Sequence, residues 1–193
     1  MRTTHCSLFV AALLVAVPLS AQQASPRQGF FFSIGAGSGS AGVECPDCDG
    51  LDLGDRLTGI AGYVRLGGTV SPGLQVGIEG TGWIKNSDGL ERRIATAGVV
   101  FVLYPVPSGG FWLKGTAGGV RAVIENDVAA LVGEGLMFGG GAGFDLPLGN
   151  GAALTPYISY FASTGTGADL NGISLGTDLN PNVLQFGVGI TIP

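Results

Sequence analysis

The stretch Asn-Val-Leu-Gln-Phe-Gly-Val-Gly-Ile-Thr-Ile, residues 182–192, decides the fold class. Large apolar side chains occupy every second position, and the positions between them carry Gln, Gly, Gly and Thr. A period of two is typical of a β-strand with one apolar face and one polar or small face. Glycine on one face suits a narrow, strongly curved sheet whose interior has little room. The stretch therefore predicts one wall strand of a small β-barrel.

Similar stretches recur along the chain, and we expect eight strands. Large apolar residues again occupy alternate positions in residues 30–36 and 138–146, whereas the stretch 94–103 is apolar on both faces. Each expected strand is close to the 9–11 residues that a tilted membrane strand requires. The expected strands are residues 29–41, 57–69, 74–85, 93–104, 111–123, 133–146, 152–162 and 182–192.

The links between these strands alternate in kind. Those after even-numbered strands are short and rich in turn-forming residues: 70–73, 105–110 and 147–151. Those after odd-numbered strands are longer or more charged: 42–56, 86–92, 124–132 and 163–181. Such alternation is typical of hairpins with short periplasmic turns and longer external loops. A soluble sandwich or lipocalin-like barrel has the same period with its apolar face turned inward, so the period leaves that alternative open.

Hydropathy and charge favour a membrane barrel. Mean hydropathy is +0.44 and glycine is abundant, at 36 residues. No apolar run after residue 21 reaches the roughly 18 residues of a membrane helix. The acids concentrate in the long links, which keeps charge out of hydrocarbon, and backbone polar groups in lipid require a closed sheet. The predicted fold is all-β, an eight-stranded antiparallel up-and-down transmembrane β-barrel. With 14 acidic and 9 basic residues the chain is acidic, so we expect no nucleic-acid partner.

The N-terminus has the composition of a secretory signal. Arg2 supplies a positive start, residues 8–19 are almost entirely apolar, and the small residues Ser20 and Ala21 follow. The apolar run is too short for a transmembrane helix. We expect a signal peptide at residues 1–21, cleaved after Ala21, and one β-barrel domain at residues 22–193. The expected location is the outer membrane of a Gram-negative cell envelope.

The stretch Phe-Gly-Gly-Gly-Ala-Gly-Phe-Asp-Leu-Pro-Leu-Gly at 138–149, followed by Leu-Thr-Pro-Tyr-Ile-Ser-Tyr at 154–160, resembles the sixth and seventh strands of the OmpA/OmpX-like small outer-membrane β-barrel superfamily. The hairpin layout extends the resemblance over residues 22–193. It implies a monomer that contacts outer-membrane lipid and lipopolysaccharide and is inserted by the barrel-assembly machinery. One departure is the C-terminus, which reads Ile-Thr-Ile-Pro where the family usually ends on an aromatic residue.

A charged cluster is predicted inside the barrel. If the turn after the second strand is centred on Pro72, residues whose numbers sum to 144 face each other, and Arg65 lies opposite Glu79 on the luminal face. A low-dielectric interior holds such charges only when they are paired, so we expect an ion pair, joined by Lys114. Two roles are open for this lumen ion pair: a gate or proton path, and a structural plug in a barrel filled by its own side chains.

No catalytic set, metal site or cofactor site is expected. The only histidine is His5, inside the predicted signal, so the usual general base for a serine nucleophile is missing. The acids of residues 47–55 do not follow the EF-hand order. Cys45 and Cys48 form an even pair in an oxidising compartment, and a loop-tying disulfide is the expected state. Tyr104 and Trp112 flank one short link and serve either as interface aromatics or as core.

These observations predict a structural, surface-exposed outer-membrane β-barrel protein without catalytic activity, whose loops contact lipopolysaccharide or external partners. One alternative is a narrow passive pore or small-ligand binder. The other is a soluble periplasmic lipocalin-like carrier.

Overall fold

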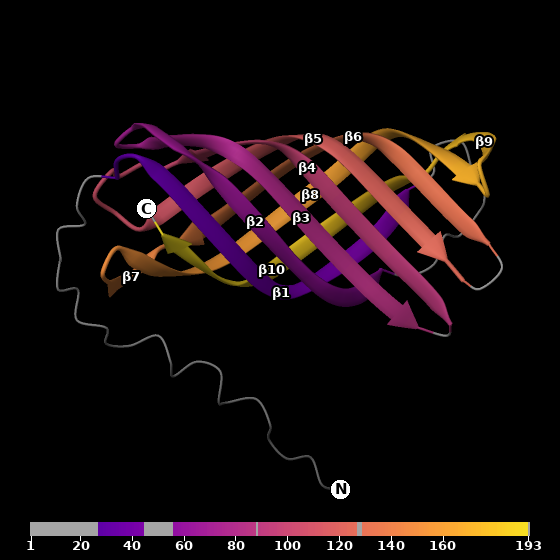
Figure 1. Ribbon diagram of the computed structural model, residues 1–193, viewed down its shortest axis with the longest axis horizontal. Coiled ribbons are helices and arrows are strands. Elements are labelled where there is room, and N and C mark those ends of the chain that lie inside the picture. Colours follow the sequence, from indigo (N-terminus) through magenta and orange to yellow (C-terminus); the bar gives the residue numbers. More distant parts are fainter. Residues whose placement is uncertain (1–26, 45–55, 88, 127–128, 193) are drawn as a thin grey trace, which may run out of the picture.

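The computed structural model of the chain describes residues 27–44, 56–87, 89–126 and 129–192. This part of the chain forms one antiparallel sheet of ten strands (Figure 1). No helix within it is long and apolar enough to cross a membrane. The strands are β1 (Phe30–Glu44), β2 (Leu57–Ser71), β3 (Leu74–Ser87), β4 (Leu90–Leu103), β5 (Phe111–Glu125), β6 (Ala130–Phe144), β7 (Leu146–Gly149), β8 (Ala152–Leu170), β9 (Ile173–Asp178) and β10 (Asn180–Ile192).

Eight of these strands close into a barrel, as the sequence predicted. Strands β1 to β6, β8 and β10 each pair with the next, and β10 also pairs with β1 along its length. The two short strands β7 and β9 both pair with β8. We call the end that carries the turns at 71–74, 104–111 and 145–152 the short-turn end. The opposite end, where β1, β3 and β5 finish and β9 lies, is the long-loop end (Figure 1).

The prediction of a long link at residues 163–181 is wrong, because most of these residues belong to strands. β8 continues to Leu170, pairing with β6, and then turns back into β9. The turn is Asn171-Gly172, and both residues have positive φ, at 50° and 82°. An Asn-Gly pair with this geometry makes the tight two-residue turn of a hairpin. The seventh strand is therefore longer than predicted, and its added residues pair with the start of β6 on one side and with β9 on the other.

The apolar face of the barrel points outward. Large apolar side chains stand exposed on the outer side of the long strands, among them Phe101 at 52%, Phe138 at 57% and Phe186 at 57% exposed. The inward positions are mixed: polar and small side chains occur there together with aromatic and aliphatic side chains that pack in the lumen. A lipocalin-like carrier requires the reverse arrangement, with its apolar faces turned into the barrel.

Glycines bring the first and last strands close together where the barrel closes. Gly37 of β1 lies opposite Gly187 of β10. A Cβ at Gly37 would lie 2.0 Å from the Phe186 carbonyl oxygen, and a Cβ at Gly187 would lie 2.2 Å from that of Ala36. No side chain fits there without moving backbone, so this pair of glycines permits the close approach of β1 and β10.

Candidate functional site

Three charged side chains from three strands meet inside the barrel. Arg65 on β2 lies opposite Glu79 on β3 in the ladder, which is the register expected from a turn centred on Pro72. The Arg65 Nε and Nη2 atoms donate to Glu79 Oε2 at 2.8 and 2.7 Å. Lys114 on β5 donates from Nζ to Glu79 Oε1 at 2.5 Å. The structure therefore brings together all three residues that the sequence named for the lumen; we call them the charged layer.

The charged layer is almost completely shielded from solvent. Residue exposure is 4% for Arg65, 1% for Glu79 and 6% for Lys114. One carboxylate faces two cations, and Thr116 adds a longer hydroxyl contact to Glu79 Oε1 at 3.4 Å. Burial of ions is costly unless they are paired and hydrogen-bonded, so Glu79 is the group that makes both cations tolerable in the lumen.

Aromatic rings supply further stabilisation for the two cations. The Arg65 guanidinium lies 5.0 Å from the ring centroids of both Tyr63 and Trp112. The Lys114 ammonium lies 5.0 Å from the ring centroid of Phe161 and 5.7 Å from that of Tyr63. The negative faces of aromatic rings attract cations at such distances, most strongly where water is excluded. These contacts offset part of the excess positive charge.

A second polar network closes the short-turn end. Asp145, 6% exposed, accepts hydrogen bonds from the Tyr104 hydroxyl at 2.9 Å, Trp112 Nε1 at 3.2 Å and Thr155 Oγ1 at 2.9 Å. Arg27 lies 3.5 Å from the carboxylate and 3.6 Å above the Tyr104 ring. Burial, reinforced by the neighbouring carboxylate, raises the pKa of the Tyr104 phenol above its ordinary value, so this hydroxyl keeps its proton and donates.

Sequence reasoning missed Asp145 as a site residue, although a signal was present. The glycines at 139, 141 and 143 face the lumen, and Asp145 is the next residue in this alternation. The period of two therefore indicates that Asp145 also points inward. The same network also answers the question about Tyr104 and Trp112. Both are buried in the lumen, at 3% and 1% exposed, so they belong to the core and not to an interface belt.

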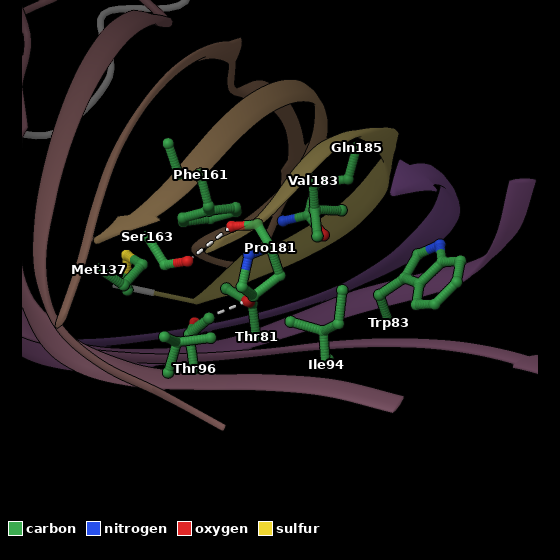
Figure 2. A pocket seen from close by; sticks show the side chains of 13 residues that line it. Thr81, Trp83, Ile94, Thr96, Met137, Phe161, Ser163, Pro181, Val183 and Gln185 are labelled. Carbon is green, nitrogen blue, oxygen red and sulfur yellow. Dashed lines mark hydrogen bonds between the residues drawn. The ribbon is translucent and has the colours of Figure 1, made fainter. Parts of the chain in front are cut away.

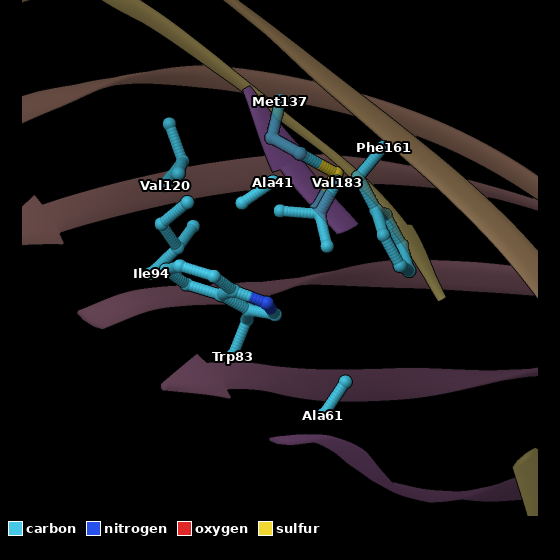
Figure 3. Close-up of a cluster of buried hydrophobic side chains, with 8 residues drawn as sticks. All are labelled: Ala41, Ala61, Trp83, Ile94, Val120, Met137, Phe161 and Val183. Carbon is cyan, nitrogen blue, oxygen red and sulfur yellow. The ribbon is translucent and has the colours of Figure 1, made fainter. Parts of the chain in front are cut away.

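An apolar layer fills the lumen on the long-loop side of the charged layer. Trp83, Met137 and Phe161 are its largest members, and they point toward one another from β3, β6 and β8 (Figure 3). Trp83 is fixed by a hydrogen bond from Nε1 to the Gly39 carbonyl at 2.9 Å. The other members are Ala41, Ala61, Ile94, Val120 and Val183.

A very small cavity lies inside this layer. It measures about 10 Å³ and lies among Thr81, Thr96, Phe161 and Gln185 (Figure 2). This volume is close to the lower limit for one buried water molecule, which needs on the order of 10–15 Å³. Inward side chains thus form three successive layers along the lumen. Strand β3 contributes to each of them, with Gln75 beside Tyr104, Glu79 in the charged layer and Trp83 in the apolar layer.

Some predicted features lie outside the described residues. These are the signal peptide at 1–21 with its cleavage after Ala21, the Cys45–Cys48 disulfide, and the acids of residues 47–55. Within the described ranges, no group of three or more His, Cys, Asp or Glu residues is arranged to hold a metal ion.

Comparison with known proteins gives similarity at the level of structure alone. Neither protein-family models nor curated proteins match the chain. Among solved structures, Neisserial surface protein A superposes with a TM-score of 0.61 at 10% identity, covering 87% of this chain and 99% of that one. The attachment invasion locus protein Ail of Yersinia pestis gives 0.54 at 15% identity, covering 86% and 99%. The outer membrane protein OprG of Pseudomonas aeruginosa gives 0.50 at 13%, covering 87% and 98%. The chain has the fold of the small eight-stranded outer-membrane β-barrels.

Proposed function

We propose that the chain is a structural protein of the outer membrane, without catalytic activity, that spans the bilayer with a closed barrel whose interior is blocked by its own side chains. The observation that carries the proposal is the apolar outer face. This face runs around the eight long strands, which pair in a closed ring. In hydrocarbon, only a closed barrel or a helix satisfies all the backbone hydrogen bonds of a membrane span. Such a surface would aggregate in water and is stabilised by lipid.

The distribution of charge supports a membrane orientation. Charged side chains on the outer face of β4, β5 and β6 stand near the long-loop end. They form exposed ion pairs: Arg93 with Glu91 and Glu125, and Arg121 with Glu134 at 3.3 Å. Charge is tolerated at the edge of the hydrocarbon and is costly at its centre. In the proposed orientation the long-loop end faces the exterior, where these arginines lie within reach of lipopolysaccharide phosphates.

The filled lumen favours a structural role over a pore. The charged layer and the apolar layer both cross the interior, and the cavity inside the apolar layer measures only about 10 Å³. Water-filled conduction needs a continuous path, which this packing does not provide. The charged layer is accordingly proposed as a plug rather than as a gate.

The described part of the barrel lacks the side chains that a hydrolytic site would need. The chain has one histidine, His5, which precedes the barrel. The two buried carboxylates of the described residues, Glu79 and Asp145, are each occupied by three or more partners. Neither carboxylate is free to act as a general base toward a substrate.

The first test is the heat-dependent mobility of the full chain, recovered from membranes in detergent, on an SDS gel. A closed barrel resists SDS until it is heated, so unboiled and boiled samples should migrate differently. Recovery in the soluble fraction without detergent, with no mobility difference, would refute the proposal. Planar-bilayer recordings address the pore separately: we expect no conductance above leak, and steady conductance that changes in Glu79→Gln would establish the pore instead.

A further inference from the structure

The lumen is not filled along its whole length. At the long-loop end, beyond the apolar layer, a cavity of about 140 Å³ remains. Its wall is mostly apolar and comes from seven strands of the barrel; the lining residues include Ala41, Leu57, Trp83, Ile124, Leu131 and Pro181. Trp83 lies between this cavity and the much smaller one below it, so the apolar layer forms the floor.

The inner wall of this cavity also carries cationic side chains. Arg92 and Arg93 are among its lining residues. Lys85 is not, but it lies directly opposite Arg92 in the β3–β4 ladder, on the same inward face as Trp83. Arg92 and Lys85 are only partly exposed. Among the described residues, no carboxylate forms an ion pair with either of them, whereas the outward Arg93 and Arg121 are both paired.

An apolar chamber with unpaired cations fits a particular ligand chemistry. Apolar walls stabilise a hydrocarbon group and offer few partners to hydroxyls, so sugars and other polyols would lose hydrogen bonds on entry. An Arg guanidinium recognises a carboxylate through paired charge-assisted hydrogen bonds. Cavities of about 150 Å³ with apolar linings hold a molecule the size of benzene.

We propose that this cavity binds a small monocarboxylate with an apolar body of about six carbon atoms, such as a short fatty acid or an aryl acid. The hydrocarbon body lies against Trp83, Ile94 and Leu131, and the carboxylate pairs with Arg92, with Lys85 beside it. Because the apolar layer closes the floor, the site holds its ligand at the long-loop end without passing it through the barrel. This binding role goes beyond the proposed structural function.

The two tryptophans of the chain provide a test with an internal control. Trp83 lines the cavity, while Trp112 is buried in the Asp145 network. The full chain is labelled with 5-fluorotryptophan, placed in lipid nanodiscs and titrated with hexanoate. Fluorine NMR should show a saturable shift of the Trp83 signal and none of the Trp112 signal. Trp83→Phe assigns the two signals.

Matched probes and variants decide the outcome. 1-Hexanol and hexylamine, which lack the carboxylate, should bind at least about tenfold more weakly than hexanoate, given the usual strength of a charge-assisted hydrogen bond. Arg92→Gln should weaken hexanoate to a similar degree, while Arg121→Gln, on the outer face, should not change it. Each variant must first show the heat-dependent gel shift, so that a misfolded barrel is not mistaken for a lost site. No saturable Trp83 shift, or equal binding of hexanol and hexanoate, would overturn the proposal.

Discussion

Replacing Glu79 by Gln should destabilise the barrel more than any single change of an exposed charge. The side chains of Arg65, Glu79 and Lys114 are 5%, 0% and 0% exposed, and among the described residues Glu79 is the only carboxylate that forms an ion pair with either cation. Glutamine nearly preserves the volume but removes the neutralising charge. Breaking a buried ion pair from one side typically costs about 3–5 kcal/mol, a factor of roughly 10² to 10³ or more in the unfolding equilibrium.

The measurement is reversible urea unfolding in phospholipid vesicles, followed by tryptophan fluorescence. Glu134→Gln is the matched control, because Glu134 pairs with Arg121 on the surface, where both side chains are more than 60% exposed. Exposed pairs of this kind contribute about 0–1 kcal/mol. If Glu79→Gln costs no more than Glu134→Gln, the account of the charged layer as a structural plug is wrong.

A triple variant separates the value of the ion network from the cost of breaking it. Arg65→Met, Glu79→Leu and Lys114→Met together remove every charge of the layer while keeping it filled. Replacing a whole buried ion network with apolar groups is often neutral or stabilising. The triple variant should therefore unfold at a urea concentration near that of the wild type, well above that of Glu79→Gln.

Three further outcomes are expected. Gly187→Ala should impair folding because its Cβ meets a carbonyl at 2.2 Å, whereas Gly82→Ala, with open space around it, should fold normally on the heat-shift gel. Phe161→Ala should lower the unfolding free energy by about 3–5 kcal/mol, because it leaves a cavity in the apolar layer. Tyr104→Phe should cost about 1–3 kcal/mol in the same urea assay, since Asp145 loses a buried donor.

Much of the architecture could be predicted from period and turn chemistry. The alternation in residues 182–192 located the last strand, and the position of Pro72 fixed the register that places Arg65 opposite Glu79. Both are local properties, since adjacent strands joined by a short turn leave little freedom in pairing. The same logic applied to Asn171-Gly172 would have revealed the hairpin of β8 and β9, but the surrounding residues 163–170 lack an apolar face and gave no strand signal.

Of the layers of the lumen, the charged layer could be predicted in this way, whereas the Asp145 network and the apolar layer could not. Asp145 contacts Tyr104 and Trp112 at the short-turn end. Trp83 of β3 packs in one cluster with Phe161 of β8, a strand far from β3 in the ladder order. Which inward residues meet across a barrel depends on strand tilt and shear, quantities that one sequence does not encode locally. For the same reason the cavity beside Arg92 was not foreseen, and Arg92 itself was assigned to the link 86–92, whereas it lies within β4.

The seam between β1 and β10 has a consequence for the order of assembly. Every other pair of adjacent long strands is consecutive along the chain, whereas the seam joins the first long strand to the last. For example, the hydroxyls of Ser33 and Thr191 lie 2.8 Å apart, although the two residues are 158 positions apart along the chain. Closing a loop of that length costs about 4–5 kcal/mol of chain entropy before any contact compensates. Hairpins should therefore form quickly and seam closure should set the refolding rate, leaving a transient open sheet with two unpaired edges. That intermediate is the species most exposed to edge-to-edge aggregation.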